Sequence, residues 1–158
     1  MTIVLNNIRS CWNVGSIMRT CDAIGAKLIL VGYTPKPIGQ TLKMINKTAI
    51  GAEDSVVWKS FEHWQEVFNA NSNNTNIAVE ISNTSIDIVD FLKTSTTLEL
   101  DKLFLWFGNE ISGLEKDLTN KCNFEVHLPM SGIKESLNIA TSVTAFAYIL
   151  DTYSRLSN

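Results

Sequence analysis

Short apolar runs alternate along the chain with longer segments in which apolar residues recur at helical spacing. Two of the short runs, Thr2–Leu5 and Lys27–Val31, have the length and composition of strands. Between them, the apolar side chains of Val14–Ile24 fall on one stripe of a helix, and Asn13 precedes it as a predicted N-cap. The opening therefore predicts a βαβ unit, which implies parallel strands and a right-handed crossover.

The rest of the chain continues this alternation of strands and helices. Leu103–Phe107 is a continuous apolar run without alternation, which is typical of a central parallel strand that is covered on both faces. Further strands are predicted at Ser55–Trp58, Ile77–Ile81 and Phe124–Leu128. Helices are predicted at Phe61–Phe68, Glu115–Lys121 and Ser136–Leu156. Loops are predicted at Thr34–Pro37 and Asn69–Asn76. The pattern predicts a single α/β domain over residues 1–158, with a mainly parallel sheet flanked by helices.

The closing helix, Ser136–Leu156, is apolar on most of its circumference. Ile139, Phe146 and Leu150 belong to one stripe, and Leu137 and Tyr148 belong to the other side. Such a helix needs more than one packing surface. Periodicity leaves two explanations open, namely complete burial inside the monomer and contact with a second subunit.

Composition and charge narrow the function. The chain has 158 residues, of which 45% are hydrophobic, and 13 basic against 16 acidic residues give a formal charge of −3. This composition excludes a disordered chain, and the acidic balance argues against a general nucleic-acid coat protein without excluding a local basic site. No signal peptide and no run near the roughly 20 apolar residues of a membrane span is present, so a cytoplasmic location is expected.

Cysteine and histidine usage predicts neither disulfides nor a metal. Cys11, Cys21 and Cys122 are odd in number and include no C-x-x-C pair. His63 and His127 are the only histidines, and neither lies at metal-ligand spacing from another soft ligand.

The loop and helix start at residues 7–20 form the first segment with candidate chemistry. Arg9 and Arg19 lie around a predicted helix N-terminus in an acidic protein. Arginine donors beside the positive end of a helix dipole attract phosphate. The alternative is two solvated arginines next to an ordinary helix cap.

Two further segments follow predicted strands. Residues 107–114 bend directly after the most apolar strand, where ligands of parallel sheets bind, and they include Glu110. Residues 128–140 form a proline-containing loop and a helix start, with Ser136 as the predicted N-cap and Asn138 in the first turn. The alternatives are a turn carboxylate in water, a simple cap and a tolerated polar helix residue.

Together these segments resemble the signature motifs of the SpoU (TrmH) family of RNA 2′-O-ribose methyltransferases in the SPOUT superfamily. The matching blocks are NIRSCWNVGSIMRTCDAIGA, LFLWFGNEISGL and VHLPMSGIKESLNIATSV, in the family's order, and KTAIGAE is similar to its connecting segment. The resemblance covers essentially the whole chain. Cys11-Trp12, Met18 and Cys21 depart from the usual pattern without affecting the reaction class.

The resemblance implies a site and an assembly. The family binds S-adenosylmethionine in a C-terminal deep trefoil knot, and works as a homodimer with residues of both subunits in each site. By motif position, the implied catalytic residues are Arg19, Asn13, Glu110, Ser136 and Asn138. The implied cofactor contacts, largely through backbone atoms, are Val79, Gly108, Leu128, Met130, Ser136 and Leu137.

The expected partner is RNA, with tRNA favoured over ribosomal RNA. No separate N-terminal RNA-binding domain is expected, so RNA would bind a small basic patch of Arg9, Arg19, Lys43, Lys47 and Lys134. The eight glycines form neither G-x-G-x-x-G nor G-x-x-x-x-G-K-[ST], which disfavours a dehydrogenase, a nucleotide hydrolase or a Rossmann-type methyltransferase. A non-catalytic RNA-binding module of the same fold is the remaining alternative.

Overall fold

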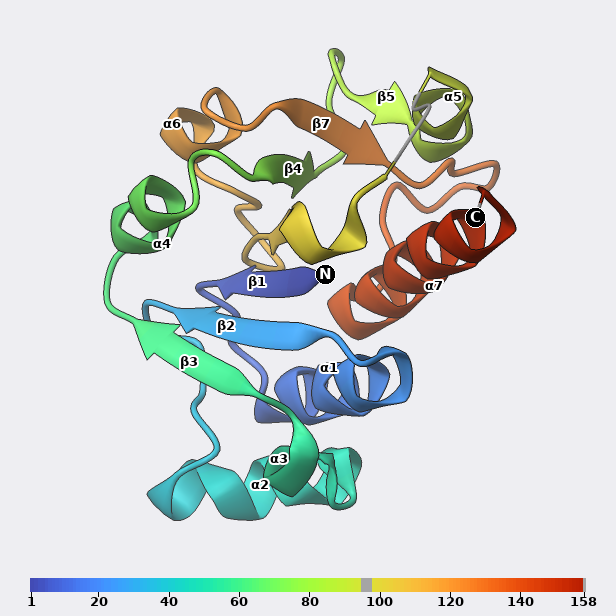
Figure 1. Cartoon of the computed structure of the whole chain (residues 1–158). Helices are drawn as coiled ribbons and strands as arrows, with labels where there is room; N and C mark the ends of the chain where they lie inside the picture. The colour runs from blue at the N-terminus through green and yellow to red at the C-terminus, as the bar shows by residue number, and fades with distance from the viewer. Residues whose placement is uncertain (95–97, 158) are drawn as a thin grey trace.

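The computed structural model of the chain describes residues 1–94 and 98–157, which form a seven-stranded sheet between two layers of helices (Figure 1). The strands are β1 (Thr2–Asn6), β2 (Lys27–Val31), β3 (Trp58–Phe61), β4 (Thr75–Val79), β5 (Ile86–Asp87), β6 (Leu103–Phe107) and β7 (Phe124–His127). Their order is β3-β2-β1-β6-β4-β7-β5, and neighbouring strands pair in parallel. The predicted α/β class with a parallel sheet is confirmed.

The helices cover both faces of the sheet. Their bounds are α1 (Cys11–Ile24), α2 (Gly39–Ala49), α3 (Ala52–Ser55), α4 (Trp64–Ala70), α5 (Ile88–Thr94), α6 (Lys116–Thr119) and α7 (Ile139–Ser157), and a 3₁₀ turn, η1 (Leu100–Lys102), precedes β6. Figure 1 shows α4 and α6 on one side of the central strands and α1 and α7 on the other. Helix α2 packs on α1.

The central strands are apolar because each must serve two cores. In β6, Leu105 faces the core under α1 and α7, and Trp106 faces the core under α4 and α6. Both side chains are fully buried, and the same holds for Ile3 and Val4 of the neighbouring strand β1. A strand with both faces covered cannot alternate with polar residues, which explains the continuous run at Leu103–Phe107.

The middle of the chain departs from the sequence-based prediction. The strand expected at Ser55–Trp58 is wrong in position, because Ala52–Ser55 is helical and the strand β3 covers Trp58–Phe61. The helix expected at Phe61–Phe68 begins three residues later, at Trp64, as α4. Strand β3 is at the edge of the sheet, next to β2. Its exposed residues Lys59 and Ser60 interrupt the apolar pattern from which a strand is predicted. Helices α2 and α5 and strand β5 were not predicted.

Both predicted helix caps are wrong. Helix α1 begins at Cys11, and its N-cap is Ser10, whose Oγ accepts from the Asn13 backbone N–H at 3.3 Å. Helix α7 begins at Ile139, and Asn138 takes the cap position, because its Oδ1 accepts from Ala140 N at 2.9 Å. Asn13 and Ser136 therefore do not cap their helices.

Helix α7 is buried on one side and open on the other. Val143, Phe146 and Leu150 are fully buried against the sheet, whereas Tyr148 is 44% exposed. The prediction of two apolar sides is confirmed, and complete burial inside the monomer is excluded for the side that carries Tyr148. Among the described residues, no helix is both long and apolar enough to span a membrane.

The polar segment Asn69–Asn76, expected as a loop, overlaps helix α4 at its start and strand β4 at its end. Its last two residues open β4, and Asn76 is fully buried. Asn76 Oδ1 accepts from the Trp106 indole N–H at 2.9 Å, and its Nδ2 donates to Asn71 O and Asn74 O. Since a buried indole N–H needs a partner, this asparagine is a structural residue of the core.

Candidate active site

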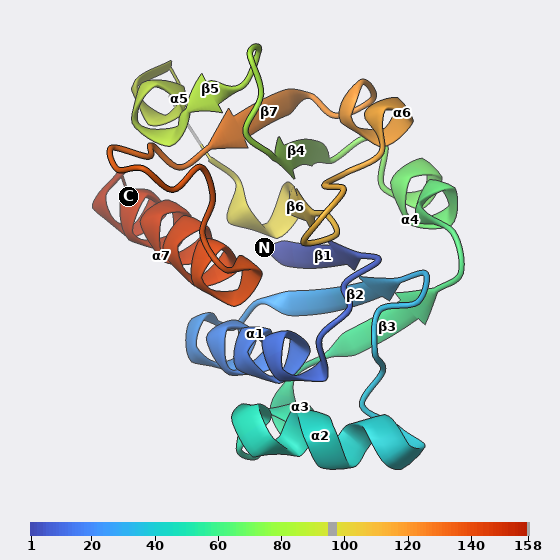
Figure 2. The ribbon, with the colours of Figure 1, turned by 180° about the vertical axis from the view of Figure 1, so that it is seen from behind.

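A cavity of about 630 Å³ opens at the carboxyl ends of β4, β6 and β7. This is where ligands bind in parallel α/β sheets. Its walls are the ends of β4 and β6, the bend after β6, and the segment between β7 and α7. Figure 2 shows that segment looping over α7 before the helix begins beside α1. The six residues expected at the cofactor line the cavity: Val79, Gly108, Leu128, Met130, Ser136 and Leu137.

The bend after β6 is a tight closed turn. Asn109 and Gly113 exchange backbone hydrogen bonds of 3.1 and 2.9 Å. The chain passes itself so closely at Gly108 that an added Cβ would lie 2.3 Å from the Gly113 carbonyl carbon. Asn109 Oδ1 accepts from Ile111 N, and its Nδ2 donates to the Tyr33 hydroxyl at 2.8 Å. The bend is therefore a rigid wall that holds Glu110 at its tip.

Glu110 lies at the meeting point of the three motif segments. Its Oε1 accepts from Asn13 Nδ2 at 3.1 Å, and its Oε2 accepts from the Arg9 backbone N–H at 3.2 Å. Asn138 Nδ2 donates to Asn13 Oδ1 at 3.2 Å. Side chains of the first helix, the bend after β6 and the start of α7 thus form one hydrogen-bonded network at the rim of the cavity.

A second hollow, of about 520 Å³, lies between α1 and α7. Asn13 and Asn138 line it together with exposed Trp12 and the small residues Ala140 and Ala145 of α7. The two helices are joined by Thr20 and Thr144, whose hydroxyls are 2.7 Å apart. The Asn13–Asn138 pair therefore stands between the two hollows.

Arg19 is not brought together with the other expected catalytic residues within one copy of the chain. It is exposed on α1 and lines neither hollow. Its spacing of seven residues from Trp12 and three from Ser16 places it on the same helix face as these two residues of the second hollow. The arginine therefore flanks the open surface between α1 and α7.

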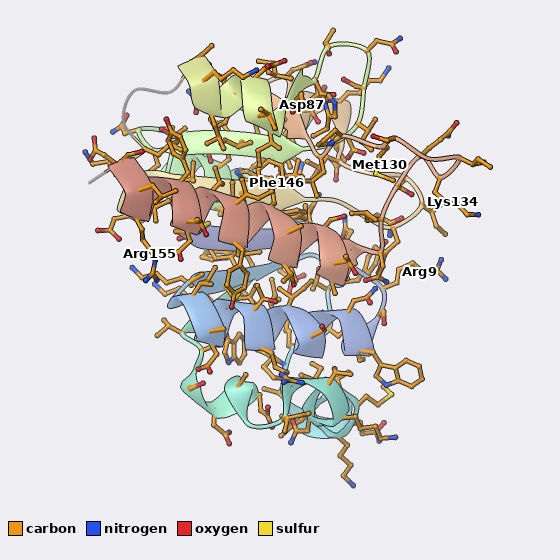
Figure 3. The ribbon with its side chains drawn as sticks, turned by 90° about the vertical axis from the view of Figure 1, so that its right-hand side faces the viewer. Arg9, Asp87, Met130, Lys134, Phe146 and Arg155 are labelled. Atoms are coloured by element: carbon orange, nitrogen blue, oxygen red, sulfur yellow. The ribbon has the colours of Figure 1, made fainter. Side chains whose placement is uncertain are left out.

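The expected RNA-binding residues are exposed cations at separate places. Arg9 and Lys134 project from the edge that also carries Met130 (Figure 3). Lys43 and Lys47 lie one turn apart on α2. Among residues 1–94 and 98–157, none of these four residues nor Arg19 takes part in a salt bridge.

Two titratable cavity residues at strand ends, Glu80 and His127, have no role predicted from the sequence. Glu80 follows β4, and burial, assisted by the charge of Glu125, raises its pKa although the Leu114 N–H stabilises the carboxylate. His127 ends β7, and its Nδ1 lies 2.9 Å from Ser85 Oγ. His127 is the last residue of its strand and Glu80 directly follows its own, so a position at the carboxyl end of a strand was the signal that could have identified them.

None of the three cysteines lines the cavity. Burial raises the pKa of both Cys21 and Cys122 to about 12, so these thiols stay protonated near neutral pH. Cys11, Cys21 and Cys122 are free. Within the described part of the chain, no group of three or more histidine, cysteine, aspartate or glutamate side chains is arranged to hold a metal ion.

Comparisons with known proteins place this geometry in a family. The model of the SpoU rRNA Methylase family matches residues 1–148. A 23S rRNA (uridine(2479)-2′-O)-methyltransferase of Streptomyces viridochromogenes is 31% identical over 143 residues, which are 86% of this chain and 47% of that protein. The 23S rRNA (guanosine-2′-O-)-methyltransferase RlmB of Nitrosomonas europaea is 28% identical over 159 residues, which cover 99% of this chain and 57% of that protein. The chain thus spans about half the length of these curated relatives.

A solved structure supports the same assignment. The SpoU methyltransferase AviRb from Streptomyces viridochromogenes, in complex with the cofactor AdoMet, superposes with a TM-score of 0.81 at 25% identity, covering 100% of this chain and 61% of that one. The predicted resemblance is confirmed: the chain belongs to the SpoU rRNA methylase family.

Proposed function

We propose that this chain is an S-adenosylmethionine-dependent methyltransferase acting on a ribose 2′-hydroxyl of RNA. The observation that carries the proposal is the Glu110 carboxylate, held by Asn13 Nδ2 and the Arg9 N–H at the rim of the cavity. Relatives named as RNA 2′-O-methyltransferases support the same reaction.

The cavity has the size and lining that an adenosine-bearing cofactor needs. Its volume of about 630 Å³ lies within the usual range of ligand pockets, and its walls combine apolar side chains with backbone groups of irregular chain. Val79, Gly108, Leu128, Met130, Ser136 and Leu137 would hold the cofactor. When bound, S-adenosylmethionine would supply an electrophilic methyl group on a sulfonium.

Arg19 is proposed to hold and orient the RNA rather than to act as a base. A guanidinium stays protonated and is only a donor, so it suits the phosphate next to the reacting ribose. The 2′-oxygen, thus aligned, would form its bond to the methyl carbon as the bond from that carbon to the sulfonium breaks and leaves a neutral thioether. The hydroxyl proton would pass to the phosphate or to water. Alignment supplies much of the rate of such an in-line displacement.

A homodimer would bring Arg19 to a second copy's cavity. Two exposed aromatic side chains support this proposal: Trp12 in the hollow between α1 and α7 is 60% exposed, and Tyr148 on the open side of α7 is 44% exposed. Apolar side chains in such a position are typical of an interface.

A trefoil knot is proposed for residues 128–138. The segment leaves β7 at one side of the sheet and reaches α7 beside α1, on the other side of β6. Its residues share one cavity with the bend after β6. This sharing supports a path in which the segment threads behind that bend.

RNA binding would use the separate exposed cations. Arg9 and Lys134 project from one edge (Figure 3), and Lys43 and Lys47 add two exposed cations on α2. We propose tRNA as the substrate, with ribosomal RNA as the alternative that the names of the two curated relatives favour.

The first test of the proposed function is cofactor binding followed by methyl transfer. Calorimetry with S-adenosylmethionine should show binding, and the protein should methylate total tRNA in preference to ribosomal RNA. Mass mapping of RNA from cells that lack the protein should then reveal a missing ribose methyl at one nucleotide. Absence of binding at millimolar cofactor would support a non-catalytic RNA-binding module instead.

The second test concerns Arg19. Arg19→Ala should lower the single-turnover rate of methyl transfer at least tenfold, while cofactor affinity stays unchanged. Arg155→Ala is the matched control, because Arg155 is an exposed helical arginine that pairs with Asp151 at the far end of α7 (Figure 3). Normal RNA binding and a retained single-turnover rate in Arg19→Ala would contradict the assignment.

A further inference from the structure

Glu80 is a carboxylate that the proposed reaction has not used. It directly follows β4, lines the cavity and is half-buried. Among the described residues it forms no salt bridge. Because a carboxylate without a cation is unfavourable at such a place, Glu80 is a candidate for a ligand contact.

The Glu80 carboxylate is held in a fixed orientation. Its Oε2 accepts from the Leu114 backbone N–H at 2.9 Å. Gly113 lets the bend after β6 come close, since an added Cβ there would lie 2.7 Å from Glu80 Oε2, and its φ of +67° is one that side chains rarely adopt. The Ile81 backbone N–H also stabilises the carboxylate. Two backbone donors still leave acceptor capacity on Glu80, because a carboxylate has about four lone-pair sites.

The position of Glu80 in the sheet indicates which part of the cofactor it meets. β4 and β1 pair with opposite sides of β6. The network of Asn13, Glu110 and Asn138 lies towards β1 and α1. In the proposed function, the methyl group would meet RNA on this side. Glu80 lies on the β4 side, so the adenosine part of the ligand, which carries two ribose hydroxyls, would lie next to it.

Carboxylates that end a strand of a parallel sheet are suited to ribose. In dinucleotide-binding folds an acidic residue at such a position accepts hydrogen bonds from a ribose hydroxyl. The requirement is chemical and independent of fold: two neighbouring hydroxyl donors match the remaining lone pairs of an oriented carboxylate.

We propose that Glu80 accepts hydrogen bonds from the ribose hydroxyls of bound S-adenosylmethionine. The inference rests on the proposed function and adds a specificity residue to it. The raised pKa of Glu80 agrees with a carboxylate whose ordinary hydration is lost before its ligand arrives.

Binding measurements with Glu80→Gln test this inference. Glutamine keeps the volume and can accept from Leu114 N, but it loses the charged acceptor. Calorimetry should show S-adenosylmethionine and the uncharged-sulfur product S-adenosylhomocysteine both weakened about tenfold, because the hydroxyls are common to them. The substitution should reduce the affinity for the 2′-deoxy and 3′-deoxy forms of S-adenosylhomocysteine by a smaller factor than it reduces the affinity for the parent compound.

Glu125→Gln is the matched control. Glu125 influences the titration of Glu80 through its charge but does not line the cavity. Its replacement should leave both affinities within twofold of the wild type. Far-ultraviolet circular dichroism and thermal melting of each variant exclude loss of folding as the cause of weaker binding.

Three outcomes would overturn the inference. Selective weakening of S-adenosylmethionine would mean that Glu80 meets the sulfonium, the one positive charge that S-adenosylhomocysteine lacks. Equal weakening of the parent and deoxy compounds would place Glu80 away from the ribose, at the ammonium group or in the wall of the cavity. Failure of the wild-type protein to bind any of these compounds would overturn the proposed function itself, and this inference with it.

Discussion

Asn13 Nδ2 donates to Glu110 Oε1 over 3.1 Å, although the two residues lie 97 positions apart in the chain. Through this bond, the first helix and the bend after β6 share one polar network. Asn138 extends the network to α7 by donating to Asn13 Oδ1. The strength of a network of this kind depends on every member being satisfied.

Removal of the Asn13 amide should therefore reduce methyl transfer more than cofactor binding. Asn13→Ala leaves the Glu110 carboxylate without its side-chain donor, whereas Asn13 does not line the main cavity. We expect a rate at least tenfold lower, with the dissociation constant for S-adenosylmethionine within threefold of the wild type. Asn120→Ala, at an exposed asparagine after α6, should change neither quantity.

Replacement of Asn138 should destabilise helix α7, whereas replacement of Ser136 should not. Asn138 Oδ1 accepts from Ala140 N as the N-cap, and Asn138→Ala should lower the free energy of unfolding by about 1 kcal/mol. Ser136→Ala should change it by less than about 0.5 kcal/mol, because Ser136 is exposed and precedes the helix. Urea unfolding followed by circular dichroism measures both, and an equal loss in the two variants would contradict the cap assignment.

Asn76→Ala should be among the most damaging substitutions in the core. It leaves the buried Trp106 N–H without an acceptor and removes the donors to Asn71 O and Asn74 O. We expect a loss of about 2–4 kcal/mol in the free energy of unfolding. Asn69→Ala, at an exposed position of α4, is the control and should stay within about 0.5 kcal/mol of the wild type by the same urea titration.

Ile50 offers a stabilising change. Its backbone adopts a φ of +51° at the end of α2, and its side chain is 70% exposed. A β-branched residue is strained there, so Ile50→Gly should raise the free energy of unfolding by about 0.5–1 kcal/mol. Ile133→Gly, at an isoleucine that is 99% exposed and has no positive φ, should give no gain in the melting temperature.

Glu80 should make stability depend on pH. Burial and the charge of Glu125 raise its pKa above the ordinary 4.5, and the Leu114 N–H only partly opposes this. The folded state therefore prefers the neutral carboxyl, and stability falls as the pH rises through the raised pKa. Glu80→Gln removes this fall, so the variant should be more stable than the wild type at neutral pH, by less than about 1 kcal/mol at this half-exposed site.

Melting temperatures measured across pH check this prediction. The advantage of Glu80→Gln should shrink as the pH falls below 4.5, where Glu80 is neutral in both the folded and the unfolded chain. A constant difference at all pH values would show that the carboxylate charge is not the cause.

The elements of the central sheet were predictable because their patterns are local. Lys27–Val31 was predicted at its observed bounds, and so was Leu103–Phe107, since a strand buried on both faces is apolar at every position. The edge strand β3 and the short β5 were misplaced or missed, because few of their side chains are buried. Helix α2, which packs on α1 rather than on the sheet, was missed as well.

The residues of the site were named from motifs, and their arrangement came from the fold. Glu110, Ser136 and Asn138 stand in the signature segments, whereas Glu80 lines the cavity from outside them. His127 stands in the third segment and also lines the cavity, without a role implied by the motif. The caps were assigned to Asn13 and Ser136 because a cap is a local signal, yet Ser10 and Asn138 hold these positions. Asn13 instead bonds to groups 97 and 125 positions away.

By itself the sequence determined the strand-forming runs, the parallel α/β class and the family, since these follow from patterns within short stretches of chain. Only the tertiary structure decided that Glu80 faces the same cavity as Met130, that α7 keeps one side open, and that Arg19 lies outside the cavity of its own copy. The physical reason is that pairings between distant segments depend on strand order and on how closely the bends pass. Both are properties of the folded chain and leave no periodic trace in the sequence.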